Sequence, residues 1–132
     1  MLSIAFSLLM RILAADDEAD VRLLLELSLG AAPDVALTLV SSGREAIERA
    51  AAERYDLIVL DGLMPDLDGA ETCRLLKQDP RTAEVPVVFL TALTSDSARD
   101  TLRSAGAAGF VTKPFDPFTI ATQLAAFAHT PG

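Results

Sequence analysis

Five polar residues of this sequence have side chains suited to metal and phosphate chemistry, and they lie just past the ends of four separate apolar runs. They are three carboxylates, a hydroxyl and an ammonium: Asp16, Asp17, Asp61, Thr91 and Lys113. Carboxylate oxygens are the ligands that Mg²⁺ prefers, and Mg²⁺ keeps further positions for water and phosphate oxygens. A hydroxyl and an ammonium suit phosphoryl oxygens. The set therefore predicts a site for a divalent cation and a phosphoryl group.

The apolar runs before these residues predict the strands that position them. Runs that alternate with helical patterns are typical of buried parallel strands. The expected strands are 10–15, 34–40, 57–60, 87–90 and 109–112. Right-handed crossovers between them place helices on both faces of the sheet. Since ligands bind at the carboxyl ends of parallel strands, we expect the polar residues to meet at one edge.

The first expected helix, within residues 21–30, has two groups of apolar residues. The inner face is predicted to hold Val21, Leu24, Leu25, Ser28 and Leu29. Leu23 and Leu27 fall outside that face, which indicates either an interaction surface or a wider buried stripe.

The last expected helix begins after Lys113 and Pro114. Asp116 is predicted to cap this helix, with Pro117 in its first turn. Its apolar residues available for burial are Phe118, Leu124 and Phe127.

Length and charge restrict the classes of function. The 132 residues suit one domain, and the formal net charge is −8. This acidic balance disfavours direct binding of nucleic acids and of anionic membranes, because both need clusters of Lys and Arg. A single cysteine, Cys73, cannot form an internal disulfide, which fits a cytoplasmic setting.

The N-terminal residues 1–9 are apolar but lack the features of a signal peptide. No Lys or Arg precedes Arg11, and the stretch is too short to span a bilayer. We therefore interpret residues 1–9 as an extension, with functional translation beginning near Met10. The expected domain covers residues 10–129, followed by a tail at 130–132.

Each candidate site residue also has an ordinary structural explanation. Asp16 and Asp17 suit a solvated helix N-terminus, where the macrodipole favours negative charge. Thr91 suits a strand end, and Lys113 alone is an ordinary surface lysine. Together, however, Asp16, Asp17 and Asp61 would repel one another, and a bound divalent cation would remove that conflict.

The sequence resembles the receiver domain of two-component response regulators, in its stand-alone, chemotaxis-type form. The matching motifs occur in the family's order: Ala15-Asp16-Asp17-Glu18, Asp61 with Met64-Pro65 and Asp68-Gly69, Thr91-Ala92, and Lys113-Pro114-Phe115. They span residues 10–129. The resemblance implies a flavodoxin-like (βα)5 three-layer α/β sandwich with a parallel sheet of order 2-1-3-4-5.

The resemblance also implies roles for individual residues. Asp61 would be the phosphoacceptor, and Thr91 and Lys113 would contact the phosphoryl group. Asp17 would bind Mg²⁺ directly, Asp16 through water, and Leu63 through its backbone carbonyl, with Asp61 completing the set.

The same resemblance implies a switch, in which Phe110 would turn toward Thr91 after phosphorylation. The switched surface is formed by the helix within 94–106, the strand 109–112 and the last helix. The implied partners are a histidine kinase or histidine phosphotransfer protein and a downstream protein. The receiver itself would be a monomer or weak homodimer. Such a module catalyses its own phosphorylation and dephosphorylation but turns over no separate metabolite.

Three other functions remain open from the sequence. One is a pseudo-receiver that binds partners without phosphate, and another is a receiver that is a fragment of a larger protein. The third is a phosphohydrolase with an aspartyl-phosphate intermediate. The haloacid dehalogenase type places a second Asp two residues after the nucleophile. Here that position is Leu63, which disfavours the third alternative.

Overall fold

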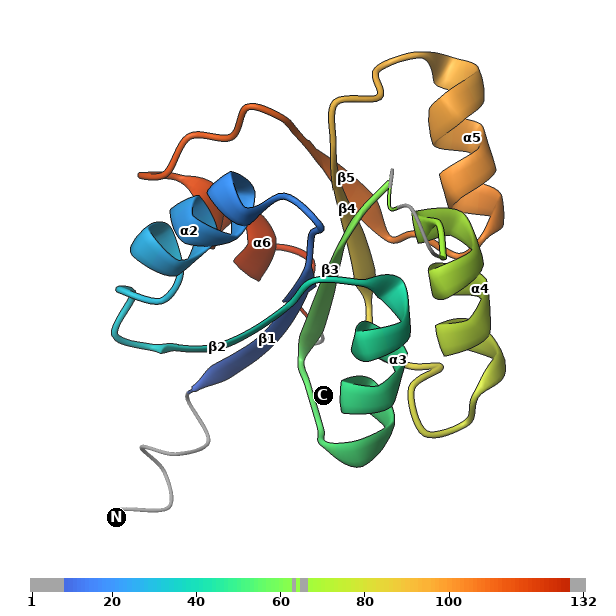
Figure 1. The fold of residues 1–132 in the computed structure, drawn as a ribbon, viewed down its shortest axis with the longest axis horizontal. Helices are drawn as coiled ribbons and strands as arrows, with labels where there is room; N and C mark the ends of the chain where they lie inside the picture. The colour runs from blue at the N-terminus through green and yellow to red at the C-terminus, as the bar shows by residue number, and fades with distance from the viewer. Residues whose placement is uncertain (1–8, 63, 65–66, 129–132) are drawn as a thin grey trace.

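A five-stranded parallel sheet forms the centre of the computed structural model, which describes residues 9–62, 64 and 67–128 (Figure 1). The strands are β1 (Met10–Ala15), β2 (Val35–Val40), β3 (Leu57–Asp61), β4 (Val87–Thr91) and β5 (Gly109–Thr112). Their order is β2-β1-β3-β4-β5, and all four neighbouring pairs are parallel. The predicted flavodoxin-like fold and strand order are confirmed. Residues 1–8 of the expected extension and the tail 130–132 lie outside the described residues.

Helices cover both faces of the sheet, as the crossover rule requires. They are α2 (Ala19–Ser28), α3 (Gly43–Ala52), α4 (Gly69–Gln78), α5 (Asp96–Ser104) and α6 (Ile120–Ala125). Figure 1 shows α2 and α6 on one face and α3, α4 and α5 on the other. None of the helices in the described part of the chain combines the length and the apolar character needed to cross a membrane.

Side-chain caps begin three of these helices. Ser42, Asp68 and Ser95 each accept a hydrogen bond from the backbone N–H three residues further on, at the starts of α3, α4 and α5. Such a bond satisfies one of the free donors of the first turn and is typically worth about 1 kcal/mol. The predicted cap at Asp68 is among them, and it fixes where the loop that follows Asp61 ends.

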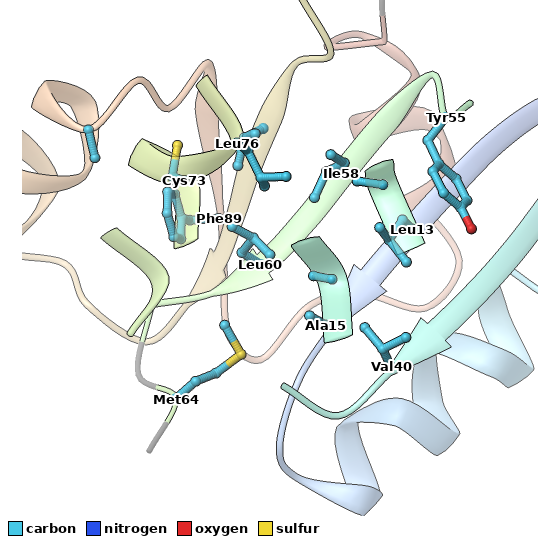
Figure 2. Close-up of a cluster of buried hydrophobic side chains, with 14 of the residues drawn as sticks. Leu13, Ala15, Val40, Tyr55, Ile58, Leu60, Met64, Cys73, Leu76 and Phe89 are labelled. Atoms are coloured by element: carbon cyan, nitrogen blue, oxygen red, sulfur yellow. The ribbon is translucent and has the colours of Figure 1, made fainter. Parts of the chain in front are cut away.

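The core lies on both sides of the sheet. Under α3, α4 and α5, side chains such as Leu13, Ile58, Leu60 and Phe89 are fully buried (Figure 2). A second cluster under α2 and α6 includes Ile12, Leu57 and Val88. Because neighbouring residues of each strand pack on opposite faces, the central strands have continuous apolar runs instead of alternating ones.

The first helix differs from the prediction at one position. Leu25 and Leu29 are buried as expected, but Leu24 is 48% exposed, so its assignment to the inner face was wrong. The run Leu23–Leu25 places three leucines over a wide arc of the helix, and only one of them faces the sheet. Leu23 and Leu27 are also exposed, which favours the interaction surface over the wider buried stripe.

The last helix begins later than predicted. Asp116 does not cap it directly, because α6 begins at Ile120. Instead, the Asp116 carboxylate accepts a hydrogen bond from the backbone N–H of Phe118 at 2.9 Å and shapes the turn that precedes the helix. Phe118 lies in this turn and is 94% exposed, so its predicted burial was also wrong, whereas Leu124 is buried.

The packing of α4 makes a testable prediction about Cys73. Its side chain is fully buried, and burial raises the pKa of the thiol to about 11. The reactive species is the thiolate, so we expect iodoacetamide at pH 8 to label the native chain very slowly and the urea-unfolded chain rapidly. Mass spectrometry gives the labelled fraction directly, since the sequence has one cysteine. Equal labelling rates in both states would contradict this packing of α4.

Candidate functional site

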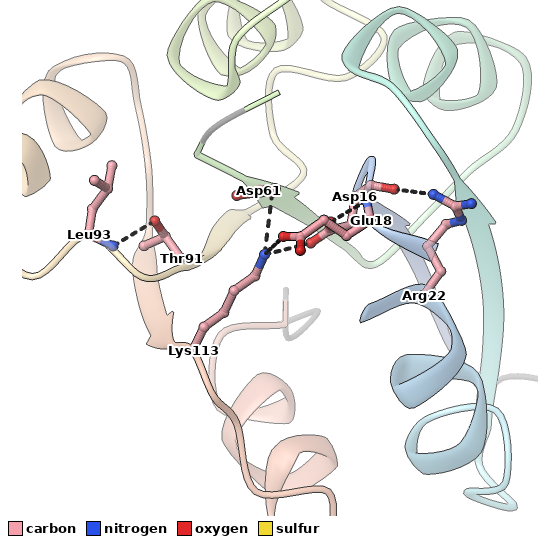
Figure 3. Close-up of polar contacts among 7 residues, drawn as sticks. All are labelled: Asp16, Glu18, Arg22, Asp61, Thr91, Leu93 and Lys113. Carbon is pink, nitrogen blue, oxygen red and sulfur yellow. Dashed lines mark hydrogen bonds and ion pairs between the residues drawn. The ribbon is translucent and has the colours of Figure 1, made fainter. Parts of the chain in front are cut away.

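The strand order brings the predicted polar residues to one edge of the sheet. Asp16 directly follows β1, and Asp61 ends the neighbouring strand β3. Thr91 ends β4, and the backbone N–H of Lys113, just after β5, donates to the Thr91 carbonyl at 2.9 Å. Four segments far apart in the sequence therefore deliver a carboxylate pair, a hydroxyl and an ammonium to the same edge of the sheet (Figure 3).

The Lys113 ammonium is the centre of this arrangement. Its Nζ lies 2.9 Å from Asp16 Oδ2, 3.3 Å from Asp61 Oδ2 and 3.4 Å from Glu18 Oε1 (Figure 3). The Asp16 and Asp61 side chains are buried, and that of Lys113 is 16% exposed. Burial alone would lower the pKa of Lys113, but the hydrogen bond and charge of Asp16, together with Asp61, outweigh it and raise that pKa. The ammonium group of Lys113 therefore stays protonated and positively charged at neutral pH.

Three carboxylates surround this single ammonium. One oxygen from each of Asp16, Glu18 and Asp61 lies within 4.8 Å of the others. The formal negative charges thus outnumber the positive one. Three clustered oxygen ligands of this kind fit a hard divalent cation, and Mg²⁺ takes one or two carboxylates together with water and phosphate oxygens.

Two hydrogen bonds fix the orientation of Asp16. Its Oδ1 accepts from the backbone N–H of Glu18 at 2.9 Å, and its backbone carbonyl accepts from Arg22 Nη1 at 2.8 Å (Figure 3). Arg22 lies in the first turns of α2, so the start of that helix and the end of β1 are tied together. The Asp16 carboxylate therefore presents its other oxygen to Lys113.

A cavity of about 160 Å³ opens beside these residues. It is lined by Asp17, Glu18, Asp61, Ala92 and Lys113. Water occupies about 30 Å³ per molecule, so this volume holds a phosphoryl group and several waters. Asp17 is exposed at the cavity, outside the tight cluster of carboxylate oxygens. Leu63, whose carbonyl was the remaining expected ligand, lies outside the described residues.

The two expected switch residues lie on neighbouring strands, Thr91 on β4 and Phe110 on β5. Thr91 is fully buried, and its Oγ1 accepts a hydrogen bond from the backbone N–H of Leu93 at 3.0 Å (Figure 3). Phe110 on β5 stacks on Phe89 of β4, with 6.5 Å between ring centroids. Phe110 is half-buried, so its ring lies between the core and the α5 surface.

Glu18 is the member of the cluster whose role the sequence did not indicate. It was part of the Asp16-Asp17-Glu18 run, but its position depends on how α2 leaves the sheet. Glu18 is the residue before the first turn of α2, in extended conformation, which turns its side chain toward Lys113. The signal in the sequence that could have indicated a role for Glu18 is that it is the third acidic residue in a row, just before a predicted helix.

Comparison with known proteins identifies the class to which this fold and site belong. The model of the response regulator receiver domain matches residues 12–125, and the chain belongs to this family. Receiver domains of this kind are signalling modules of two-component systems, in which phosphorylation and Mg²⁺ binding are typical.

The chain is similar to individual members of this family in both sequence and structure. It is 44% identical to the response regulator PleD of Caulobacter vibrioides over 107 residues, which are 80% of this chain and 23% of PleD. The solved structure of the chemotaxis protein CheY4 of Vibrio cholerae superimposes with a TM-score of 0.85 at 28% identity, covering 90% of this chain and 98% of CheY4.

A third relative was solved with a metal ion. The receiver domain of the sensor histidine kinase PA1611 of Pseudomonas aeruginosa PAO1 has a TM-score of 0.76 at 28% identity, covering 90% of this chain and 97% of that one. Its structure contains magnesium coordinated in the active-site cleft. The present chain spans less than half of the length of curated relatives such as PleD.

Proposed function

We propose that this receiver domain accepts a phosphoryl group on Asp61 from a histidine kinase or a histidine phosphotransfer protein. The observation that supports the proposal most strongly is the ion-pair geometry at the sheet edge. Lys113 Nζ contacts both Asp61 and Asp16, so the same ammonium lies within reach of any group attached to Asp61. A charged donor held in this way offsets negative charge without having to reorganise during the reaction.

In this mechanism an Asp61 carboxylate oxygen attacks the phosphorus of a phosphohistidine. A P–O bond forms while the P–N bond breaks, and the electron pair of that bond leaves with the imidazole nitrogen. Lys113 attracts the phosphoryl oxygens throughout the transfer, which depends on positioning and charge and needs no covalent chemistry from other side chains. The product is an acyl phosphate on Asp61, which water can hydrolyse.

The acidic cluster supports Mg²⁺ as the cofactor. Asp16, Asp17 and Asp61 are the proposed side-chain ligands, with the backbone of Leu63, and the structure adds Glu18 as a candidate. When bound, Mg²⁺ would supply positive charge to the phosphoryl oxygens and to the carboxylates.

Thr91 and Phe110 are the proposed switch. The Thr91 hydroxyl, now accepting from Leu93, would move to donate to a phosphoryl oxygen on Asp61, and Phe110 would turn inward behind it. The surface formed by α5, β5 and α6 would change with them. Because packed interiors are bistable, small movements of this kind can be amplified into a change of binding surface.

The phosphodonor is proposed to dock beside α2. A groove of about 320 Å³, lined in part by Val21, Leu24, Pro114 and Phe115, reaches Lys113. The exposed Leu23 and Leu27 extend the apolar surface along the helix. A partner helix placed on this surface would bring a phosphohistidine toward the cavity beside Asp61.

Incubation with acetyl phosphate tests this function without the cognate kinase. We expect intact-mass spectrometry to show one added phosphoryl group per chain when Mg²⁺ is present, and none in a matched sample with EDTA. A chain that remains unmodified over hours at high acetyl phosphate and Mg²⁺ would support the pseudo-receiver instead. Uptake that is equal with and without EDTA would contradict the role of the acidic cluster.

A further inference from the structure

We propose that Arg99 is a positioning residue that holds Thr91 and Phe110 in the unphosphorylated arrangement. This inference rests on the proposed function, because it concerns the switch that phosphorylation of Asp61 would operate. Arg99 lies in α5, and its guanidinium group contacts both the loop after β4 and the strand β5.

Three contacts place the guanidinium between these segments. Arg99 Nε donates to the Leu93 carbonyl at 3.3 Å, and Nη2 donates to Thr112 Oγ1 at 3.0 Å. Its central carbon lies 5.1 Å from the ring centroid of Phe110. A planar guanidinium can donate in several directions and stack on an aromatic ring at the same time, which an ammonium cannot do.

These contacts connect the two switch residues. Both backbone polar groups of Leu93 are hydrogen-bonded. Its N–H donates to Thr91 Oγ1, and its carbonyl accepts from Arg99 Nε. A movement of Thr91 toward Asp61 would displace Leu93 and strain its bond to Arg99. An inward turn of Phe110 would remove its ring from the same guanidinium. Arg99 therefore opposes both parts of the proposed transition.

Arg103, one turn further along α5, provides a matched control. Its central carbon lies 5.0 Å from the Phe110 centroid, and its Nη1 donates to Asp100. Arg103→Ala therefore removes one positive charge and one ring contact from the same helix, while the bonds of Arg99 to Leu93 and Thr112 stay. If charge or the ring contact alone were responsible, the two alanine variants would behave alike.

The test is the affinity for beryllium fluoride, which mimics a phosphoryl group, titrated in the presence of Mg²⁺ and followed by ¹H–¹⁵N NMR. A ligand that favours one state binds more tightly when the competing state is destabilised. We expect Arg99→Ala to bind about 5-fold more tightly than the wild type, the lower end of typical coupling between sites. Arg103→Ala should stay within about 2-fold of the wild type. Arg99→Lys should resemble Arg99→Ala, because it lacks the planar fork.

A double-mutant cycle separates this role from a merely structural one. In a Phe110→Leu background the effect of Arg99→Ala should shrink, because one of its contacts is already absent. Loss of a structural contact alone would lower the melting temperature without tightening the binding of beryllium fluoride. Unchanged or weaker binding by a folded Arg99→Ala variant would overturn the inference, while normal binding by the wild type would leave the proposed function intact. A wild-type chain that neither binds beryllium fluoride nor takes up phosphate would instead refute the proposed function itself.

Discussion

Asp61→Asn is expected to abolish phosphoryl uptake from acetyl phosphate. The substitution keeps the shape of the side chain but replaces the nucleophilic carboxylate oxygen with a neutral amide, which does not attack phosphorus at a useful rate. The fold should persist, because Lys113 keeps its 2.9 Å ion pair with Asp16. Intact-mass spectrometry after equal incubation of variant and wild type measures the difference.

Asp56→Asn is the matched control for this variant. Asp56 lies directly before β3 and accepts a hydrogen bond from the backbone N–H of Arg11, at the opposite end of the strand from Asp61. The same chemical change is thus made at both ends of one strand. We expect Asp56→Asn to take up one phosphoryl group as the wild type does, and full uptake by Asp61→Asn would show that another residue is the acceptor.

Lys113→Met is expected to slow phosphoryl uptake by about 10²-fold, the typical effect of removing one donor that stabilises developing negative charge. The same variant should be less stable. The buried Asp16 carboxylate would lose its ion pair with Lys113, and breaking a buried ion pair by removing one partner costs about 3 kcal/mol. Urea unfolding measures this loss, and single-turnover labelling measures the rate.

Magnesium separates the two effects of Lys113→Met. A divalent cation binding among the carboxylates of the folded state should restore much of the lost stability, since a ligand that binds only the native state stabilises it. The uptake rate should remain low, because the ammonium beside Asp61 is still absent. Lys113→Arg, which keeps the charge, should be close to wild type in stability. Recovery of the full uptake rate in Lys113→Met would remove Lys113 from the mechanism.

The pH dependence of this stability has a definite sign. The pKa of Lys113 is raised in the folded state: burial lowers it, but the carboxylates of Asp16 and Asp61 more than compensate. A raised lysine pKa contributes stability that is complete below the ordinary value of about 10.4 and is lost as the pH rises through the folded-state value. The stability difference between wild type and Lys113→Met should therefore shrink above about pH 10.4. Cys73 also titrates in this range but is common to both chains, so its contribution cancels.

Most of the fold could be predicted from the sequence because its signals are local. Continuous apolar runs mark the strands, and Asp68 marks a helix start. The exposure of Leu24 and Phe118 could not be predicted in the same way. Three successive leucines in α2 allow more than one buried face, and the angle at which the helix meets the sheet selects Leu25. Phe118 lies in a turn that resembles a helix start in sequence, with a capping Asp116 and Pro117.

In the candidate site too, some residues could be predicted from local sequence signals, whereas other contacts depend on tertiary packing. Asp16, Asp61, Thr91 and Lys113 were predictable because each lies at the carboxyl end of a strand, and parallel strands end at one edge. The contact between Glu18 and Lys113 depends on the direction in which α2 leaves that edge. The contacts of Arg99 depend on the packing of α5 against β5, which joins residues 93, 99, 110 and 112 across three elements. Spacing along the sequence carries no signal for such a cluster.

The chemical identity of the phosphorylated residue tests most directly whether Asp61 is the phosphoacceptor. Borohydride reduces an aspartyl phosphate to homoserine, and peptide mass spectrometry then locates the altered residue. After labelling with acetyl phosphate and Mg²⁺, we expect homoserine at position 61 alone. Reduction products at Asp16, Asp17 or Glu18, with Asp61 unmodified in a labelled chain, would contradict it.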